Sequence, residues 1–295
     1  MSSKRSAKSS AKPRIAFLGA GNLAVALAVS LRRAGYRIEQ IITRDDPGSL
    51  RRARRLAQKV GASAAALSLA QIKAEIVWFC VPDGAIADAA QLLTRAATVA
   101  ADWKGKVALH SSGASTSDEL DVLRKRGAAV ASVHPLMTFV RGSRPPLKGV
   151  PFAVEGDARA IRAARAIIAD LGGQPFSIGK QQKAVYHAWG MFTSPLLTAL
   201  LAASETVALQ AGIDRKAARQ RMQAILRQTL ANYARLGAAE SFSGPIARGD
   251  VRTVQKHLNV LSAIPLARQI YIALARSALH ELPVKKVAAL RKILS

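Results

Sequence analysis

The sequence predicts an α/β fold in which a doubly wound, mostly parallel sheet is followed by an all-α domain. Up to about residue 179, short apolar runs of strand length alternate with amphipathic helical segments, which is the pattern of βαβ units. Beyond residue 179 only helical segments follow, and a glycine-rich turn comes directly after the first apolar run. We therefore predict a tail over 1–13, an α/β domain over 14–179 and a helical domain over 180–295.

The individual elements follow from the local hydrophobic pattern. Apolar runs predict strands at 14–19, 36–42, 75–81, 106–110, 128–133, 150–154 and 174–178. Apolar residues at helical spacing predict helices at 22–34, 48–60, 116–126 and 157–171. The second domain is predicted to hold helices near 181–211, 214–236, 250–258, 262–279 and 283–293, with breaks at Gly212, Gly237, Gly244-Pro245 and Pro283.

The net charge is high, because 44 lysines and arginines against 18 acidic residues leave +26. Part of the excess lies in the Ser-rich tail 1–13, which holds no acidic residue and too few apolar ones to pack, so we predict that it is disordered. The rest is spread along helical segments without a known docking motif, so we expect no nucleic-acid partner. Local positive potential suits a small anionic substrate or a phosphorylated cofactor.

Cysteine content and hydropathy bear on the location of the chain. The single cysteine, Cys80, can form neither an internal disulfide nor a metal cage, so we expect a cytoplasmic protein without a bound metal ion. Residues 184–204 contain no Asp, Glu, Lys or Arg and are long enough to span a membrane, but they include polar residues, glycine and proline. We predict a buried helix, no membrane contact and, because the helical domain is apolar, a homodimer.

Residues 19–24 read Gly-Ala-Gly-Asn-Leu-Ala, between a predicted strand and a predicted helix. This G-x-G-x-x-A pattern is typical of the Rossmann domain: the first glycine permits a tight turn, and the second lets a pyrophosphate approach the backbone amides at the helix N-terminus. The alternative is a purely structural turn. We predict a dinucleotide-binding Rossmann domain in which Gly19, Gly21, Asn22 and Leu23 contact the cofactor.

The end of the second strand predicts which nicotinamide cofactor is bound. Thr43 and Arg44 stand where an enzyme that selects NAD usually carries an acidic residue for the ribose hydroxyl. An arginine there can bind the 2′-phosphate instead. The nearby Asp45 and Asp46 argue for NAD unless they only form the following turn. We predict NADP.

Three further strands end in residues that can reach the nicotinamide half of the cofactor or the substrate. Val81-Pro82-Asp83, His110-Ser111 and His134 each follow an apolar strand, and ligands bind outside the carboxyl ends of parallel strands. We predict cofactor contacts for Val81, Pro82, Asp83, His110 and Ser111 and a catalytic role for His134. The alternative is that each histidine merely holds a loop.

A polar stripe marks the first helix of the second domain. Lys183, His187, Gly190 and Ser194 follow one another at spacings of four, three and four, which places them on one helix face. Lysine and histidine can supply the proton that accompanies hydride transfer, so we predict catalytic roles for Lys183, His187 and Ser194. The alternative is a solvated lysine followed by a histidine satisfied in the core.

A loop later in the helical domain, residues 243–250, combines glycine, proline and charge. Arg248 can bind a carboxylate, and Asp250 can either orient Arg248 or cap the next helix. We predict that both residues contact substrate.

The segments 19–24, 110–113, 132–139, 183–188 and 243–250 together resemble a bacterial family of Rossmann-like oxidoreductases. Its C-terminal helical domain is of unknown function, and it is related to pyrroline-5-carboxylate reductases, ketopantoate reductases and β-hydroxyacid dehydrogenases. The resemblance covers nearly everything after the tail. It implies an NADP-binding first domain, a helical dimerising second domain and a site between the two.

The chain departs from the wider superfamily at one position. The superfamily pairs a lysine on the first helix of the second domain with an asparagine; Lys183 matches the lysine, but Pro195 stands where close relatives are expected to carry asparagine. The leading hypothesis is an NADP-dependent oxidoreductase for a small carboxylate-bearing carbonyl, imine or hydroxyacid. The alternatives are a prephenate-dehydrogenase-like enzyme, suggested by the His-Pro-Leu segment at 134–136, and a non-catalytic NADP-responsive binding protein.

Overall fold

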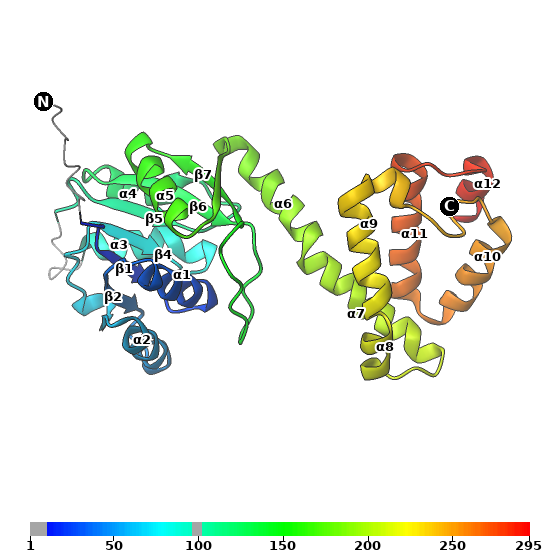
Figure 1. Ribbon diagram of the computed structural model, residues 1–295, viewed down its shortest axis with the longest axis horizontal. Helices are drawn as coiled ribbons and strands as arrows, with labels where there is room; N and C mark the ends of the chain where they lie inside the picture. The colour runs from blue at the N-terminus through cyan, green and yellow to red at the C-terminus, as the bar shows by residue number, and fades with distance from the viewer. Residues whose placement is uncertain (1–10, 96–101) are drawn as a thin grey trace, which may run out of the picture. The chain divides into compact units, whose positions relative to one another are not determined.

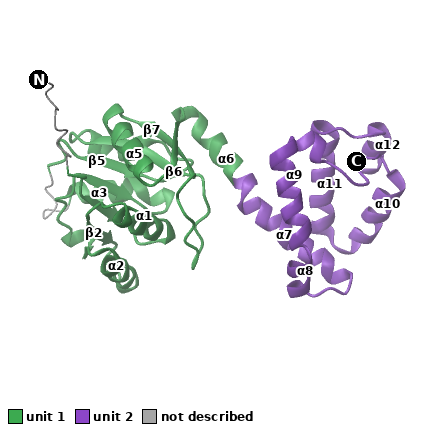
Figure 2. Cartoon of the chain, in the orientation of Figure 1, with its two compact units in different colours: residues 1–190 green, residues 191–295 purple. Residues whose placement is uncertain are grey.

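The computed structural model describes residues 11–95 and 102–295, and the chain divides into two compact units, 1–190 and 191–295 (Figure 2). Most of the predicted disordered tail, residues 1–10, lies outside the described residues. Within the described part of the tail, Lys12 donates to the Asp170 carboxylate at 2.7 Å. The division falls later than residue 179 because helix α6 (Lys183–Thr193) buries Lys183 and Tyr186 in the first unit.

One eight-stranded sheet forms the centre of the first unit, in the order β3-β2-β1-β4-β5-β6-β7-β8 (Figure 1). Neighbouring strands are parallel except for β6 and β7, which run antiparallel. The strands are β1 Ile15–Leu18, β2 Ile38–Thr43, β3 Ser63–Ala66, β4 Ile76–Phe79, β5 Val107–His110, β6 Ala129–Pro135, β7 Pro151–Gly156 and β8 Gln174–Ser177. The predicted doubly wound, mostly parallel sheet is confirmed.

Helices cover both faces of this sheet, because successive residues of each strand point to opposite sides. Ile15 and Phe17 of β1 pack with apolar residues of α1, α2 and α5, whereas Ala16 and Leu18 pack with those of α3 and α4. The helices are α1 Asn22–Arg33, α2 Pro47–Val60, α3 Ile86–Arg95, α4 Asp121–Arg124 and α5 Ala158–Asp170. The carboxyl ends of β1, β4 and β5 lie at one edge, where the glycine turn also lies.

The second unit is all-helical, as predicted. Its buried core comes from α10, α11 and α12, through Val254, Leu258, Ala275, Leu279 and Leu290. The helices are α7 Pro195–Gln210, α8 Arg215–Arg221, α9 Gln223–Ser241, α10 Val251–Val260, α11 Pro265–Glu281 and α12 Val287–Ile293. The predicted break at Gly237 is a residue with φ +78° inside α9.

The segment that the sequence predicts as one buried helix differs in two ways. It is broken at Ser194, because Pro195 takes the first position of α7, where a missing N–H costs nothing. It is also exposed: Lys180–Gln210 is long and apolar enough to cross a membrane by length and composition, but none of its most apolar 18-residue window, whose mean hydropathy is 1.4, is buried. The prediction of burial is wrong for the single chain, since α7 contributes no residue to the core of its unit.

Candidate functional site

The glycine turn links β1 to α1 as the sequence predicts. Gly19 has φ +111°, and a Cβ at this position would lie 2.2 Å from the carbonyl oxygen of Cys80, so the turn accepts only glycine. Above Gly21 the space is open, with no atom within 4 Å of a Cβ placed there. No side chain caps the first amides of α1 and no acidic residue lies in its first turn. These N–H groups can therefore bind a phosphate.

A hollow of about 480 Å³ opens beside this turn. Six of the residues predicted to bind the cofactor line it: Gly19, Gly21, Thr43, Arg44, Val81 and Pro82. Arg44 is 82% exposed, with Nε 3.7 Å from the Asp46 carboxylate. Arg52 of α2, which the sequence analysis did not single out, also lines the hollow and donates to the Ser49 hydroxyl at 2.8 Å. The fit to a dinucleotide is good, because an open turn, free amides and two arginines adjoin one cavity.

The other predicted cofactor residues lie around the hollow. Asn22 lines a second, basic hollow of about 820 Å³ beside α2 and donates to the carbonyl of Phe139 at 3.1 Å. Leu23 packs against the core, and the Ser111 hydroxyl accepts a hydrogen bond from the Trp78 indole at 2.8 Å. Asp83 begins a 3₁₀ turn after β4.

His110 is fully buried at the end of β5, and both of its ring nitrogens are used within the fold. Nδ1 accepts from the Ser112 N–H at 3.2 Å, so Nε2 carries the hydrogen that it donates to the Thr116 carbonyl at 3.0 Å. Burial is the main reason that the pKa of His110 falls to about 4, and the Lys183 charge lowers it further. In this structure the neutral ring holds the 111–117 loop.

Lys183 is fully buried in the first unit. Its Nζ donates to the carbonyl of Ser112 at 2.9 Å and to the hydroxyl of Ser132 at 2.6 Å, and Ser132 in turn donates to the same carbonyl at 3.1 Å. Burial lowers the pKa of Lys183 to about 8, against the opposing charges of Glu155 and Asp83. The lysine thus joins α6 to the loop after β5 and to the middle of β6.

His134 of β6 meets Tyr186 and His187 of α6 in an aromatic cluster. Nδ1 of His134 and the hydroxyl of Tyr186 share a hydrogen bond of 2.9 Å, and the rings of His134 and His187 meet edge to face with centroids 6.0 Å apart. Gly113 lies against both histidines: a Cβ there would be 2.5 Å from Cδ2 of His187 and 2.9 Å from Nε2 of His134. His134 and His187 are partly exposed, so this cluster is the accessible part of the site.

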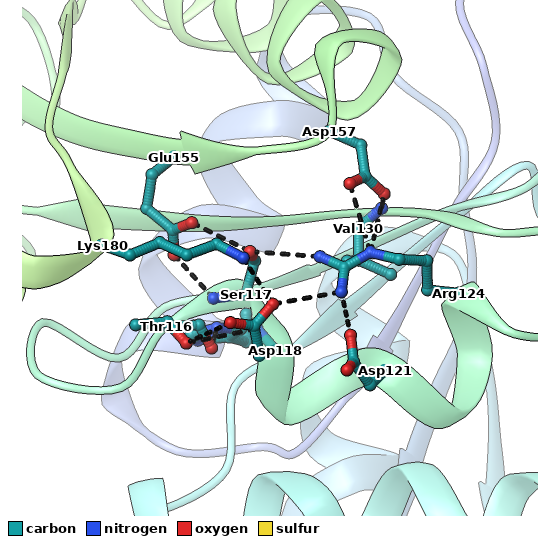
Figure 3. Close-up of polar contacts among 10 residues, drawn as sticks. Thr116, Ser117, Asp118, Asp121, Arg124, Val130, Glu155, Asp157 and Lys180 are labelled. Carbon is teal, nitrogen blue, oxygen red and sulfur yellow. Dashed lines mark hydrogen bonds and ion pairs between the residues drawn. The ribbon is translucent and has the colours of Figure 1, made fainter.

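A polar network fixes the loop that carries Gly113 from the other side (Figure 3). The buried Glu155 carboxylate accepts from the backbone N–H of Ser117 at 2.6 Å and from its hydroxyl at 2.9 Å. Lys180, just before α6, forms an ion pair with Asp118. Arg124 binds the carboxylates of Asp118, Asp121 and Asp157. The loop is therefore held at both ends, by His110 and by this network.

Ser194, Arg248 and Asp250 belong to the second unit. Ser194 is the residue between α6 and α7, and Arg248 is exposed in the loop before α10. Asp250 caps α10, since its carboxylate accepts from the N–H of Thr253 at 3.0 Å and from its hydroxyl at 2.7 Å. The hydroxyl hydrogen bond is the largest cause of the lowered pKa of Asp250. Of the two readings of Asp250, the structure shows the helix cap.

Sequence reasoning did not single out Ser132 and Tyr186. Residue spacing could have identified both. Ser132 precedes His134 by two residues on a strand and so shares its face, and Tyr186 follows Lys183 by three residues on a helix and so shares the face of Lys183. Among the described residues, no three His, Cys, Asp or Glu side chains are grouped as metal ligands would be.

Comparison with solved structures shows the same fold. A provisionally named NADP oxidoreductase from Bacteroides fragilis is 24% identical, covers 90% of this chain and 97% of its own, and gives a TM-score of 0.74. Protein TM1727 from Thermotoga maritima is 24% identical, with 95% and 98% covered and a TM-score of 0.67. A reductive aminase from Aspergillus terreus, solved with NADPH and ethyl-5-oxohexanoate, is 14% identical, with 95% and 99% covered and a TM-score of 0.65. No curated protein matches the chain.

Two family models match adjacent parts of the chain. A Rossmann-like domain matches residues 2–135, and a domain of unknown function, DUF2520, matches residues 150–278. The DUF2520 match begins within the first unit, at β7, and includes α6, which carries Lys183 and His187. The chain therefore carries a Rossmann-like domain followed by the domain of unknown function DUF2520.

Proposed function

We propose that the chain is an NADP-dependent oxidoreductase that transfers a hydride to or from a small carboxylate-bearing carbonyl, imine or hydroxyacid. The observation that carries the proposal is the hollow at the glycine turn, lined by Arg44 and Arg52 and open above Gly21. Two structural neighbours support it, since one is described as an NADP oxidoreductase and the other was solved with NADPH. When bound, the nicotinamide supplies or accepts the hydride.

We assign proton exchange and positioning to different residues of the first unit. His187 is partly exposed beside His134, so we assign to it the exchange of the proton that accompanies the hydride. Lys183 is fully buried, so we assign to it the positioning of the Ser112 carbonyl and the Ser132 hydroxyl. In the second unit, Ser194 remains a predicted catalytic residue, and Arg248 and Asp250 remain predicted substrate residues.

Cofactor binding is tested by calorimetric titration with NADPH and, separately, NADH. Wild type should bind NADPH more tightly, and Arg44→Ala should lose about tenfold or more of NADPH affinity while NADH affinity changes little, because a charge-assisted hydrogen bond to the 2′-phosphate is removed. Arg54→Ala is the matched control, since Arg54 is an exposed arginine of α2 that does not line the hollow. Equal affinity for both cofactors would contradict the choice of NADP.

A second candidate function is a non-catalytic NADP-responsive binding protein. Two observations favour it. Lys183 is completely buried, and residue 195 is a proline, so the expected pair of an accessible lysine and an asparagine is absent from these two positions. NADPH binding without hydride transfer to any of a panel of keto acids and imines would support this candidate over the enzyme.

We also propose that the protein is cytoplasmic and that it forms a homodimer through the exposed apolar surface of α6 and α7. Phe192 is 72% exposed and Leu196 45% exposed, and large exposed apolar patches mark interfaces. Sedimentation velocity should give twice the chain mass for wild type and the chain mass for Phe192→Ser/Leu196→Ser. Leu69→Ser, a change at a leucine of the first unit that is 69% exposed, should stay dimeric. A monomeric wild type would contradict the proposal.

A further inference from the structure

The two strand-end histidines differ in what their ring nitrogens do. Both nitrogens of His110 are occupied, one by the N–H of Ser112 and the other by the carbonyl of Thr116. For His134 the only hydrogen bond found among the described residues is the one between Nδ1 and the Tyr186 hydroxyl, at 2.9 Å. Nε2 of His134 is therefore the strand-end imidazole nitrogen left for a ligand.

The direction of the bond between His134 and Tyr186 follows from the burial of the tyrosine. Tyr186 is 8% exposed, and its hydroxyl has no other hydrogen-bond partner among residues 11–95 and 102–295. If Nδ1 carried the hydrogen, the phenolic hydrogen would be left unpaired, at a cost of about 1–3 kcal/mol. The hydroxyl therefore donates to Nδ1, and the hydrogen of the neutral ring lies on Nε2.

The charges around the pair keep both groups neutral. Burial is the main cause that lowers the pKa of His134 to about 4; Lys183, His187 and His110 lower it further, and Asp83 opposes them. Burial raises the pKa of Tyr186 to about 12, so the phenol keeps its proton. At neutral pH the ring of His134 therefore has one donor and one acceptor nitrogen.

The donor nitrogen faces the accessible cluster. Nε2 of His134 lies beside Gly113, where a Cβ would approach it to 2.9 Å, and the ring packs edge to face against His187. The glycine lets the loop backbone approach both rings, since a Cβ there would also lie 2.5 Å from Cδ2 of His187. The N–H thus lies next to the group to which we assign proton exchange.

We propose that His134 is a neutral hydrogen-bond donor for an oxygen atom of the substrate, a carbonyl or carboxylate oxygen, and that Tyr186 is the positioning residue that sets its tautomer. A donor held in place before the reaction stabilises negative charge that develops on that oxygen. The geometry excludes Nδ1 as a base, because it is occupied by Tyr186. The substrate part rests on the proposed function, whereas the tautomer does not.

The tautomer can be measured directly on the full chain by long-range ¹H–¹⁵N correlation spectra of the imidazole rings at pH 7, with His134→Gln used to assign the signal. We expect a pyrrole-type Nε2 and a pyridine-type Nδ1 for His134. In Tyr186→Phe, the share of the Nδ1–H tautomer should rise from below about a tenth to roughly half, because one hydrogen bond is lost. A wild-type ring that carries its hydrogen on Nδ1, or that is protonated, overturns the proposal even if Tyr186→Phe does not fold.

The chain offers a matched control for the tyrosine. His257 and Tyr271 form a second pair, with Nδ1 3.1 Å from the hydroxyl and rings at 86°, the same interplanar angle as in the first pair. Tyr271→Phe should leave the His134 signal unchanged. An unchanged His134 signal in Tyr186→Phe would overturn the role of Tyr186.

The substrate part is tested with two variants of His134. Gln carries an amide N–H near the position of Nε2, whereas Leu carries none, so kcat/KM should be at least about tenfold higher for His134→Gln than for His134→Leu. Equal values would overturn the donor role. Absence of NADPH binding would instead overturn the proposed function and leave the tautomer result standing.

Discussion

Gly19→Ala is expected to lower the free energy of unfolding by roughly 2 to 6 kcal/mol. Its φ of +111° is unfavourable for any residue with a Cβ, and that Cβ would lie 2.2 Å from the backbone oxygen of Cys80. Because the contact is with backbone of the adjacent strand, neither side can move without disturbing the sheet. Urea denaturation followed by circular dichroism measures the change.

Variants of two other glycines distinguish backbone strain from steric contact as causes of this loss of stability. Gly35 has φ +85° but no atom within 4 Å of a built Cβ, so Gly35→Ala reports backbone strain alone and should cost about 1 to 2 kcal/mol. Gly21 has φ −77° and open space above it, so Gly21→Ala should cost less than about 1 kcal/mol. A similar loss of stability in Gly19→Ala and Gly35→Ala would show that the close approach to Cys80 is not the cause.

Gly21→Ala should separate stability from binding. Since the turn faces an open hollow, a methyl group there obstructs the approach of a pyrophosphate to the first amides of α1 without disturbing the fold. We expect NADPH affinity to fall by about tenfold or more, a loss of at least 1.4 kcal/mol. Unchanged affinity in the calorimetric titration would place the pyrophosphate elsewhere.

Most of the sheet was predictable because its strands are apolar runs bounded by turns. The exception is β3, Ser63–Ala66, whose sequence Ser-Ala-Ala-Ala has neither β-branched nor aromatic residues. This edge strand forms through pairing with β2, which local propensity does not show. Helix α3 was also missed, although Ile86, Ala90 and Leu93 are spaced by four and three, as on one buried helix face.

Residue spacing predicted which helix face and which strand ends carry the site residues. Lys183 and His187 do share a helix face, and His110 and His134 do lie at strand ends. What spacing could not show is which neighbour covers that face. Lys183 is buried because the loop after β5 and Ser132 of β6 lie over it, and these contacts join residues 51 and 71 positions apart. The helix face that was expected to line a cleft therefore includes a buried residue, Lys183, which holds the loop after β5 in place.

Lys183→Met is expected to lower turnover by about 100-fold or more while leaving NADPH affinity nearly unchanged. Methionine fills a similar volume but leaves the carbonyl of Ser112 and the hydroxyl of Ser132 without their cationic partner. The loop that carries Gly113 then loses its anchor, whereas the glycine turn is untouched. Lys73→Met, at an exposed lysine of the same unit, is the control. An equal loss of turnover and NADPH affinity would contradict the role assigned to Lys183.

The same variant has a distinct stability signature, because Lys183 has a pKa of about 8 in the folded chain against 10.5 for an ordinary lysine. Between these pH values the folded chain binds fewer protons than the unfolded one, so the free energy of unfolding rises with pH over this window. The full difference is about 3 kcal/mol, and below pH 8 the wild type bears the whole cost of the buried charge. The stability of wild type relative to Lys183→Met should therefore rise by that amount between pH 8 and 10.5. Parallel curves over this window would mean that folding does not lower the pKa of Lys183, so that the folded chain keeps the ammonium group protonated up to the pKa of an ordinary lysine.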